Sequence, residues 1–189
     1  MKYLGSKTLE TERLIIKPQT MGEQKRLWEI LMIPEVNRYF LTVPPKFGDK
    51  LKDWEKQEEY YKEDMKHAND NDVFRWSIFL KDTDICIGRI SCQDGESDNP
   101  DIRDIGWLID PDYQRQGYAY EAASAVLDFM FNECEIDKIV TSAAIVNPAS
   151  WKLMEKLGFI RQKENKMVQY TYVSNLTENY TYVLDKYNI

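Results

Sequence analysis

The feature that most constrains the fold is the stretch 104–130, which reads as a strand, a short turn and a long helix. Its strand part, 104–109, is rich in β-branched and aromatic residues, and Pro111 removes a backbone donor and ends the strand near Asp110. From Ala119 onwards, apolar residues recur every three or four positions, which places them on one face of a helix. This pattern predicts a helix packed against a sheet.

The turn between strand and helix contains Gly117. Glycine permits a backbone angle that is closed to other residues, so several successive N–H groups can point into one concavity at the helix start. The helix dipole and the unpaired N–H donors favour an anion such as phosphate there. The turn lacks the Lys-Ser or Lys-Thr ending of a P-loop and the three glycines of a dinucleotide fingerprint. The alternative is a tight connection in which Gly117 supplies only the bend.

The composition indicates one globular domain over residues 1–189, because no linker divides the chain. The longest apolar runs are too short to span a membrane, and the first residues lack the apolar core of a secretory signal, so a cytoplasmic protein is expected. The net charge of −7 argues against nucleic acid as the main partner. It permits a cationic substrate, although acidity can also serve solubility alone.

The three cysteines, Cys86, Cys92 and Cys134, contain no C-x-x-C pair and leave an odd count, which fits a reducing compartment rather than a disulfide framework. His67 is the only histidine and adjoins a polar run, so it is expected at the surface. No set of further ligands with suitable spacing accompanies it, and no metal is predicted.

Strand and helix patterns alternate along the rest of the chain. Thr20 and Glu23 have the spacing of a capping box, so a helix is expected from there to Pro34. The aromatic, proline-broken segment 39–48 predicts an irregular loop that covers a site, and the acidic run 93–101 predicts a surface loop. The other expected strands are 11–17, 73–80, 85–91, 137–146, 159–162, 168–173 and 180–185, and the other helices are 50–67 and 148–157.

Two linked motifs point to a family. Gln114-x-x-Gly117-x-Ala119 follows one strand, and Asn147-Pro148-Ala149-Ser150 follows the next strand about thirty residues later, ahead of Glu155-Lys156-Leu157-Gly158-Phe159. This order resembles the GNAT superfamily of acetyltransferases. Thr11-Glu12-Arg13-Leu14, together with the runs 106–111 and 117–122, resembles more narrowly its ribosomal-protein alanine N-acetyltransferase branch. The resemblance covers almost the whole chain.

The resemblance implies an α+β fold, an α/β sandwich whose central mixed, mostly antiparallel sheet has six to seven strands and helices on both faces. It implies acetyl-CoA as cosubstrate, with its pyrophosphate on the backbone amides of 115–120, in agreement with the anion site above. It also implies a bulged strand near Asp110 that splays from the next strand and leaves backbone groups for the pantetheine arm. The implied cofactor-binding residues are Leu108, Ile109, Asp110, Gln114, Arg115, Gln116, Gly117, Tyr118, Ala119, Tyr120 and Asn147.

Three positions of the second motif concern the cofactor and the leaving thiolate. Asn147 matches the family asparagine that contacts the cofactor, although an amide just before a helix can also be an N-cap. Many relatives have a tyrosine four residues beyond Ser150 that is thought to protonate the thiolate, but this chain has Met154, which cannot donate a proton. In the branch that this chain resembles, the serine at 150 is the implied donor instead. Its hydroxyl can also cap the helix.

The acceptor amine must be neutral to attack, so a group should accept its proton directly or through water. Asp104 is the first candidate because it begins the central strand, and strand parity puts it on the face opposite Ile105 and Trp107. The alternative is a surface carboxylate paired with Arg103 or Arg89. Glu121 is a weaker candidate, since the helix dipole already explains an acid in the first turn.

The leading hypothesis is an enzyme that moves acetyl from acetyl-CoA to a primary amine by direct attack in a ternary complex, without a cysteine nucleophile. The resemblance favours a peptide or protein N-terminus as acceptor. Polyamines and antibiotics are alternatives, as are a CoA-binding sensor or scaffold and a helix-turn binding protein without cofactor. A homodimer is left open. The aromatic residues that the family would place near the acceptor are Trp28, Tyr39, Phe40, Phe47 and Trp54.

Overall fold

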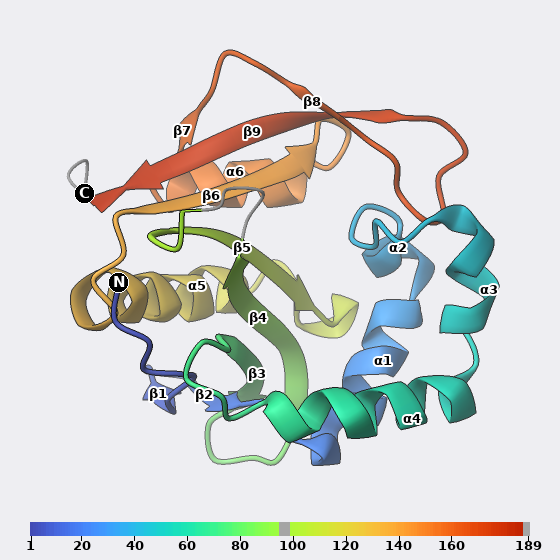
Figure 1. Cartoon of the computed structure of the whole chain (residues 1–189), viewed down its shortest axis with the longest axis horizontal. Coiled ribbons are helices and arrows are strands. Elements are labelled where there is room, and N and C mark those ends of the chain that lie inside the picture. The colour runs from blue at the N-terminus through green and yellow to red at the C-terminus, as the bar shows by residue number, and fades with distance from the viewer. Residues whose placement is uncertain (95–98, 187–189) are drawn as a thin grey trace.

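The structure is a computed structural model that describes residues 1–94 and 99–186 (Figure 1). Residues 95–98 of the predicted acidic loop lie outside this range. The strands are β1 (Leu9–Glu10), β2 (Leu14–Pro18), β3 (Arg75–Leu80), β4 (Cys86–Asp94), β5 (Ile102–Ile109), β6 (Lys138–Ala144), β7 (Ile160–Arg161), β8 (Lys166–Val168) and β9 (Thr177–Asp185). The α-helices are α1 (Gln24–Met32), α2 (Pro34–Asn37), α3 (Gly48–Leu51), α4 (Trp54–Asp64), α5 (Tyr118–Asp128) and α6 (Pro148–Lys156). Short 3-10 turns and one π-turn are η1 (Met21–Glu23), η2 (Pro45–Phe47), η3 (Met65–His67), η4 (Pro111–Tyr113) and η5 (Phe129–Glu133).

The strands of the described residues form one sheet of nine, in the order β1-β2-β3-β4-β5-β6-β9-β7, with β8 also paired to β9. Every neighbouring pair is antiparallel except β5 and β6. This confirms the mixed, mostly antiparallel sheet, but six to seven strands is too low a number. The short strand β7 falls within the predicted strand 159–162, whereas β1 and β8 are only two or three residues long, too short for alternation of apolar and polar residues to define them.

The parallel pairing of β5 with β6 covers only three residues and ends at Asp104 opposite Val140. Beyond that point the two strands diverge, as Figure 1 shows. The expected splay at the end of β5 is therefore present, and it opens the sheet at its only parallel junction.

The bulge that the family resemblance placed in β5 is not there. β5 pairs with β4 without a register shift from Arg103 to Ile109. The shift lies on the other edge of β4, where Ile78 pairs with Gly88 and Phe79 pairs with Cys86. The additional residue bends β4 beside the end of β5. A side chain on Gly88 would collide with the Leu108 carbonyl oxygen.

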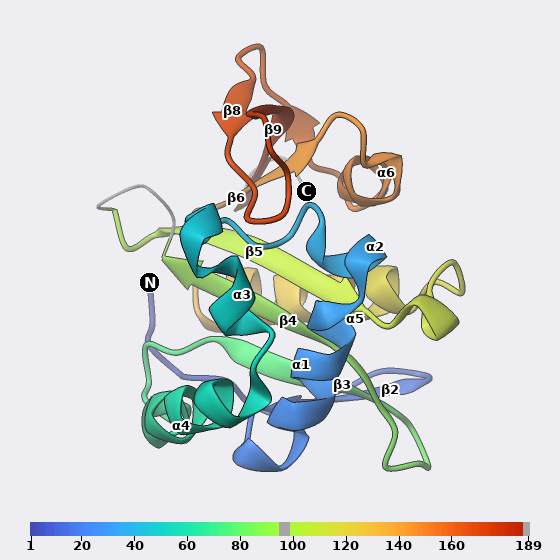
Figure 2. The same ribbon diagram turned by 90° about the vertical axis from the view of Figure 1, so that its right-hand side faces the viewer.

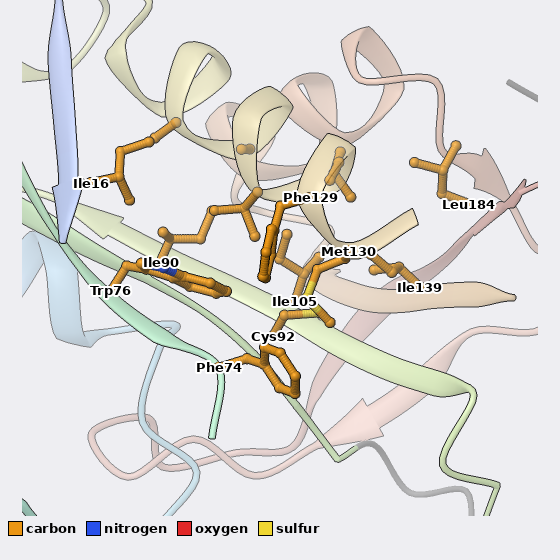
Figure 3. Packing of buried hydrophobic residues seen from close by; sticks show 14 of the residues in the cluster. Ile16, Phe74, Trp76, Ile90, Cys92, Ile105, Phe129, Met130, Ile139 and Leu184 are labelled. Atoms are coloured by element: carbon orange, nitrogen blue, oxygen red, sulfur yellow. The ribbon is translucent and has the colours of Figure 1, made fainter. Parts of the chain in front are cut away.

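Helices cover both faces of the sheet, as predicted (Figure 2). Helix α5 packs on one face over the main core, in which Trp76, Ile90 and Ile105 meet Phe129 and Met130 (Figure 3). Helices α1 and α2 cover the other face, where a smaller cluster contains Ile30, Leu31 and Leu108. The parity of β5 thus sends odd-numbered side chains towards α5 and even-numbered ones towards α1 and α2.

Some of the helix and strand boundaries predicted from local sequence signals agree with the structure, and others differ. Thr20 and Glu23 form the predicted capping box, and Pro34 both ends α1 and begins α2. The predicted helix 50–67 is instead three pieces, since Asp53 is extended between α3 and α4 and the last turn is η3. The predicted strand 168–173 is wrong beyond Val168, because the chain turns there and the Thr171 N–H donates to the Leu41 carbonyl at 2.8 Å. Within residues 1–94 and 99–186 no helix has the length and apolarity needed to cross a membrane.

Candidate active site

Two cavities lie on either side of the splayed end of β5. The first, of about 600 Å³, includes Asp104 and Gly106 of β5 and residues of β8 and β9. The second, of about 470 Å³, lies between the end of β5 and the starts of α5 and α6. Four residues line both cavities, so the two spaces adjoin there: Tyr39, Phe40, Trp107 and Ser150. We call the first the acceptor cavity and the second the donor cavity.

The donor cavity contains most of the predicted cofactor-binding residues. Its described lining includes nine of them: Leu108, Ile109, Gln114, Arg115, Gly117, Tyr118, Ala119, Tyr120 and Asn147. Asp110 and Gln116 do not line it. Residues that lie some forty positions apart in the sequence are thus brought to one space by the strand–turn–helix unit and the start of α6.

The turn before α5 has the geometry of an anion site. Gly117 is the N-cap of α5 with φ of +87°, and Arg115 also has a positive φ of +60°. A left-handed residue beside a helix start orients successive N–H groups to one side, and the first-turn N–H groups of an α-helix have no intrahelical partner. Gly117 thus supplies the predicted bend, and this bend also leaves N–H donors at the wall of the donor cavity.

Arg13, which directly precedes β2, holds this turn in place. Its guanidinium Nη1 donates to the Gln116 carbonyl at 3.0 Å, and its Cζ lies 4.5 Å from the centre of the Tyr118 ring. The Glu121 carboxylate accepts hydrogen bonds from the Arg13 backbone N–H and Nε, both at 2.8 Å, and from the Thr11 hydroxyl at 2.6 Å. The Thr11–Leu14 motif therefore supports the turn rather than contacting either cavity.

Glu121 is fully engaged in that support. Burial on its own raises the pKa of its carboxyl, but the hydrogen bonds from Thr11 and Arg13 outweigh burial and hold the pKa below its ordinary value. Glu121 is absent from the lining of both cavities. Glu121 therefore positions Arg13 and the turn before α5, and it lies outside the cavities in which a general base would act.

On the edge of β5 that faces the splay, the exposed backbone N–H and C=O groups are those of Trp107 and Ile109. The Asp110 N–H donates to Ile87 of the β4 side at 2.8 Å, whereas the Ile105 carbonyl accepts from Thr141 of β6 at 2.9 Å. Backbone N–H and C=O groups of successive residues point to opposite sides of a strand, so those of Trp107 and Ile109 point to the β6 side. The described chain provides no paired strand there. The Gln114 side chain donates to the Ile109 carbonyl at 2.9 Å.

This parity corrects two of the expected backbone contacts. Leu108 pairs with Arg89 of β4, and its side chain is buried under α1. Asp110 is 4% exposed, its N–H is bonded to Ile87, and its carboxylate pairs with Arg26 and caps η4. The unpaired backbone groups on this edge are therefore those of Trp107 and Ile109, rather than those of Leu108 and Asp110 as predicted. Trp107 was not among the predicted cofactor-binding residues.

Cationic side chains on α6 also line the donor cavity. Lys152 and Lys156 are one helical turn apart and face the start of α5, where the Lys156 ammonium lies 4.3 Å from the centre of the Tyr120 ring. Among the described residues, no carboxylate lies within 4 Å of either lysine or of Arg115, so all three charges are available to an anion. Sequence reasoning missed both lysines, although their mutual spacing of four residues places them on one face of the helix.

Asn147 and Ser150 both lie at the start of α6. Asn147 is the N-cap position, but its side chain makes no capping hydrogen bond, so the capping interpretation of this residue is wrong. Ser150 is the third helical residue and its N–H donates to the Asn147 carbonyl at 3.2 Å. In the described part of the chain its hydroxyl has no hydrogen-bond partner, and it lines both cavities. Met154 lies one turn further along and is 2% exposed.

The acceptor cavity is bounded by aromatic side chains and by β9. Tyr39, Phe40 and Thr42 come from the segment predicted to cover a site, which confirms that prediction. Trp28 and Trp54 do not line the cavity but pack on each other, with ring centres 5.4 Å apart. Gly106 forms part of the floor and has no atom within 4 Å of the place where a side chain would begin.

Asp104 lies on the predicted face of β5, opposite Ile105, and lines the acceptor cavity together with Ser150. Arg103 is on the opposite face of the strand, is 1% exposed and pairs with Asp94. The Arg89 guanidinium lies 5.4 Å from the centre of the Phe40 ring.

The cysteines are unsuited to nucleophilic catalysis. All three are buried and free, and none lines either cavity. Burial raises the pKa of the Cys86 and Cys134 thiols to about 11 and raises that of Cys92 further, so all three are neutral thiols at pH 7. His67 is exposed, as predicted, and bonds Asp70. In the part of the chain that the structure describes, no three His, Cys, Asp or Glu residues gather as metal ligands.

A mixed sheet that splays at one parallel junction, a helix start arranged for a phosphate and an adjoining cavity with a carboxylate together define an acyltransferase site. The chain belongs to the acetyltransferase (GNAT) domain family, whose model matches residues 13–160. Acetyl-CoA is the cosubstrate of that family. The donor cavity fits it, because the first N–H groups of α5 meet there with three cations that have no carboxylate partner among the described residues.

The chain is similar to two proteins of Bacillus subtilis (strain 168) described as uncharacterized N-acetyltransferases. It is 33% identical to YnaD over 97 residues, which is 51% of this chain and 55% of YnaD, so that match spans about half of each protein. It is 29% identical to YoaA over 167 residues, which is 87% of this chain and 88% of YoaA.

Solved structures share the fold. Spermidine N-acetyltransferase from Vibrio cholerae, in complex with CoA and spermine, superposes with a TM-score of 0.77 at 17% identity and covers 94% of this chain and 98% of its own. Ribosomal-protein-S5-alanine acetyltransferase from Vibrio fischeri superposes with a TM-score of 0.71, also at 17% identity, over 95% of this chain and 96% of its own. At these identities the likeness concerns the fold, and the two acceptors differ.

Proposed function

We propose that this protein acetylates a primary amine, favouring a peptide or protein N-terminus, by direct attack within a ternary complex. The observation that carries the proposal is that the donor and acceptor cavities adjoin at Trp107 and Ser150. An amine in one space and a thioester in the other would meet without an intermediate carrier. Acetyl-CoA supplies the activated acetyl group.

The residues around the junction have complementary roles in this proposal. The N–H groups at the start of α5, with Arg115, Lys152 and Lys156, hold the phosphates. The backbone of Trp107 and Ile109 holds the pantetheine arm and offers an N–H donor to the carbonyl oxygen that gains charge.

Two side chains handle protons in the proposal. Asp104 accepts the proton of the amine, directly or through water, and Ser150 gives its hydroxyl proton to the leaving sulfur. Asn147 contacts the donor through its free amide. The free cysteines and the net charge of −7 support a reaction in the cytoplasm without a nucleic-acid partner.

Met154 favours one alternative. It lies in the lining of the acceptor cavity where many relatives have a proton-donating tyrosine, so a protein that binds CoA with little turnover is the second candidate. Small amines such as polyamines are a third, because the spermidine enzyme has the same fold.

Two measurements separate these functions. Thermal unfolding should shift upwards with acetyl-CoA, because a ligand that binds only the native state stabilises it. No shift at millimolar acetyl-CoA would contradict both CoA-dependent functions. Thiol release should then rise with peptide amines, whereas a shift without thiol release from any amine would identify a sensor.

A further inference from the structure

One side chain in the acceptor cavity has an unsatisfied polar atom. Asn179 of β9 is 1% exposed, and its Oδ1 is the one buried side-chain oxygen or nitrogen in residues 1–94 and 99–186 without a hydrogen-bond partner. Leaving such an acceptor unpaired is destabilising, so a buried amide of this kind normally has a partner. Asn179 belongs to the lining of the acceptor cavity, so a molecule bound there would lie beside it.

The amide of Asn179 is held in place by its other end. Its Nδ2 donates to the Tyr170 hydroxyl oxygen at 2.7 Å and to the Ser142 hydroxyl at 3.4 Å. Tyr170 is itself 4% exposed and fixed by an edge-on contact with Tyr39, whose ring centre is 5.5 Å away. A fixed amide with one open oxygen is therefore pre-arranged for a donor on a ligand.

The Tyr170 hydroxyl complements that oxygen. It accepts from Asn179, and in the described part of the chain its own proton has no acceptor. Burial raises the pKa of Tyr170, so the hydroxyl keeps this proton at neutral pH. The cavity wall thus presents a hydrogen-bond acceptor and a hydrogen-bond donor on neighbouring side chains.

A peptide group needs this combination. It carries an N–H donor and a carbonyl acceptor, whereas a polyamine carries donors only and several positive charges. Asp104 is the only carboxylate among the described residues that line the cavity, and Lys166 lines it too, so the wall lacks the negative charge that a polycation would require.

We infer that Asn179 and Tyr170 determine acceptor specificity by binding the first peptide group of the substrate, Asn179 Oδ1 accepting from its N–H and the Tyr170 hydroxyl donating to its carbonyl. This inference rests on the proposed acetyl transfer and names the chemical feature that distinguishes its acceptor. Asn179 and Tyr170 act in substrate binding, and the proton steps at Asp104 and Ser150 are separate.

The test compares acceptors that differ only in the first peptide N–H. Thiol release is measured with a tripeptide amide, with the same tripeptide methylated on the nitrogen of its second residue, and with spermidine. For the wild-type protein, methylation should lower kcat/KM by about 10- to 100-fold, as expected for an unpaired buried acceptor. Asn179→Leu should lose a similar factor with the unmodified peptide and be insensitive to methylation.

Tyr170→Phe keeps the ring and removes the hydroxyl, and it should also weaken peptide turnover. Tyr172→Phe is the matched control, since the Tyr172 hydroxyl donates to the Gly48 carbonyl at 2.9 Å outside the cavity. An unchanged upward shift of unfolding temperature with acetyl-CoA shows that each variant is folded with its donor cavity intact. If Asn179→Leu does not fold, wild type with the methylated peptide and Tyr170→Phe decide the question.

The possible failures are distinguishable. Equal turnover of the two peptides by the wild type, or a preference for spermidine, would overturn the role of Asn179 and leave acetyl transfer standing. Thiol release from no amine would overturn the proposed function and this inference together.

Discussion

Arg13 and Glu121 are joined by two hydrogen bonds at 2.8 Å, one from the backbone N–H of Arg13 and one from its Nε, although 108 positions separate them. The same guanidinium reaches the Gln116 carbonyl. Arg13, just before β2, thereby fixes the turn that precedes α5, so the position of the backbone amides proposed to bind phosphate depends on this ion pair.

Arg13→Ala should weaken acetyl-CoA binding more than it weakens the fold. The Arg13 side chain is 42% exposed, so loss of its ion pair should cost about 1 kcal/mol of stability. The released turn should raise the Kd for acetyl-CoA on the order of tenfold, since the amides lose their fixed direction. Calorimetric titration and thermal unfolding measure the two effects. Arg161→Ala, which removes an exposed arginine stacked on Tyr180 outside both cavities, should leave Kd unchanged.

Gly117→Ala and Gly158→Ala form a matched pair. Both glycines have left-handed backbones, with φ of +87° and +91°, so each alanine should cost about 1–2 kcal/mol of stability. Only at Gly117 would the new Cβ meet the Arg13 guanidinium, at 3.2 Å. Acetyl-CoA affinity should fall for Gly117→Ala alone. Equal affinity in the two variants would show that Gly117 supplies only a bend.

Protonation of Glu121 at acid pH should weaken the contacts that hold the turn before α5. The pKa of Glu121 in the folded protein lies below its ordinary value of 4.5, so its contribution to stability is complete above pH 4.5 and is lost as the pH falls through the folded-state pKa. The free energy of unfolding, measured by urea titration between neutral and acid pH, should fall less steeply in Glu121→Gln than in wild type. Parallel pH profiles would mean that Glu121 binds its proton equally in the folded and unfolded states.

Ser150→Ala should separate chemistry from binding. Loss of a general acid typically lowers kcat by about 100-fold or more, while the donor contacts of α5 remain, so the Kd for acetyl-CoA should not change. Ser124→Ala, in α5 and outside both cavities, is the control. A normal kcat in Ser150→Ala would show that Ser150 is not the general acid, so that a water molecule would have to protonate the thiolate.

The unit 104–130 could be predicted from local signals, namely a strand, Gly117 and apolar helical spacing. The splay and most of the donor-cavity residues followed instead from the family resemblance. The contacts that it missed join distant segments. The parity of Trp107 and Ile109 follows from pairing with β4. Lys152 and Lys156 become relevant only when the fold brings α6 and the start of α5 to the same cavity.

The acceptor side was less predictable for the same reason. β8 is three residues long, and the turn after it is fixed by Thr171, whose hydroxyl donates to the Val43 carbonyl at 2.6 Å across 128 positions. No local pattern encodes that contact. The segment 39–48 could be identified as a cover, but not which of its aromatic residues face the cavity.

The central claim is that the amine attacks the thioester directly where the two cavities adjoin. Initial rates of thiol release over a matrix of acetyl-CoA and peptide concentrations test it most directly. Transfer within a ternary complex predicts double-reciprocal lines that intersect. Parallel lines, the pattern of an acetylated protein intermediate, would contradict the claim and would require a reactive group that the buried, neutral Cys86, Cys92 and Cys134 do not provide.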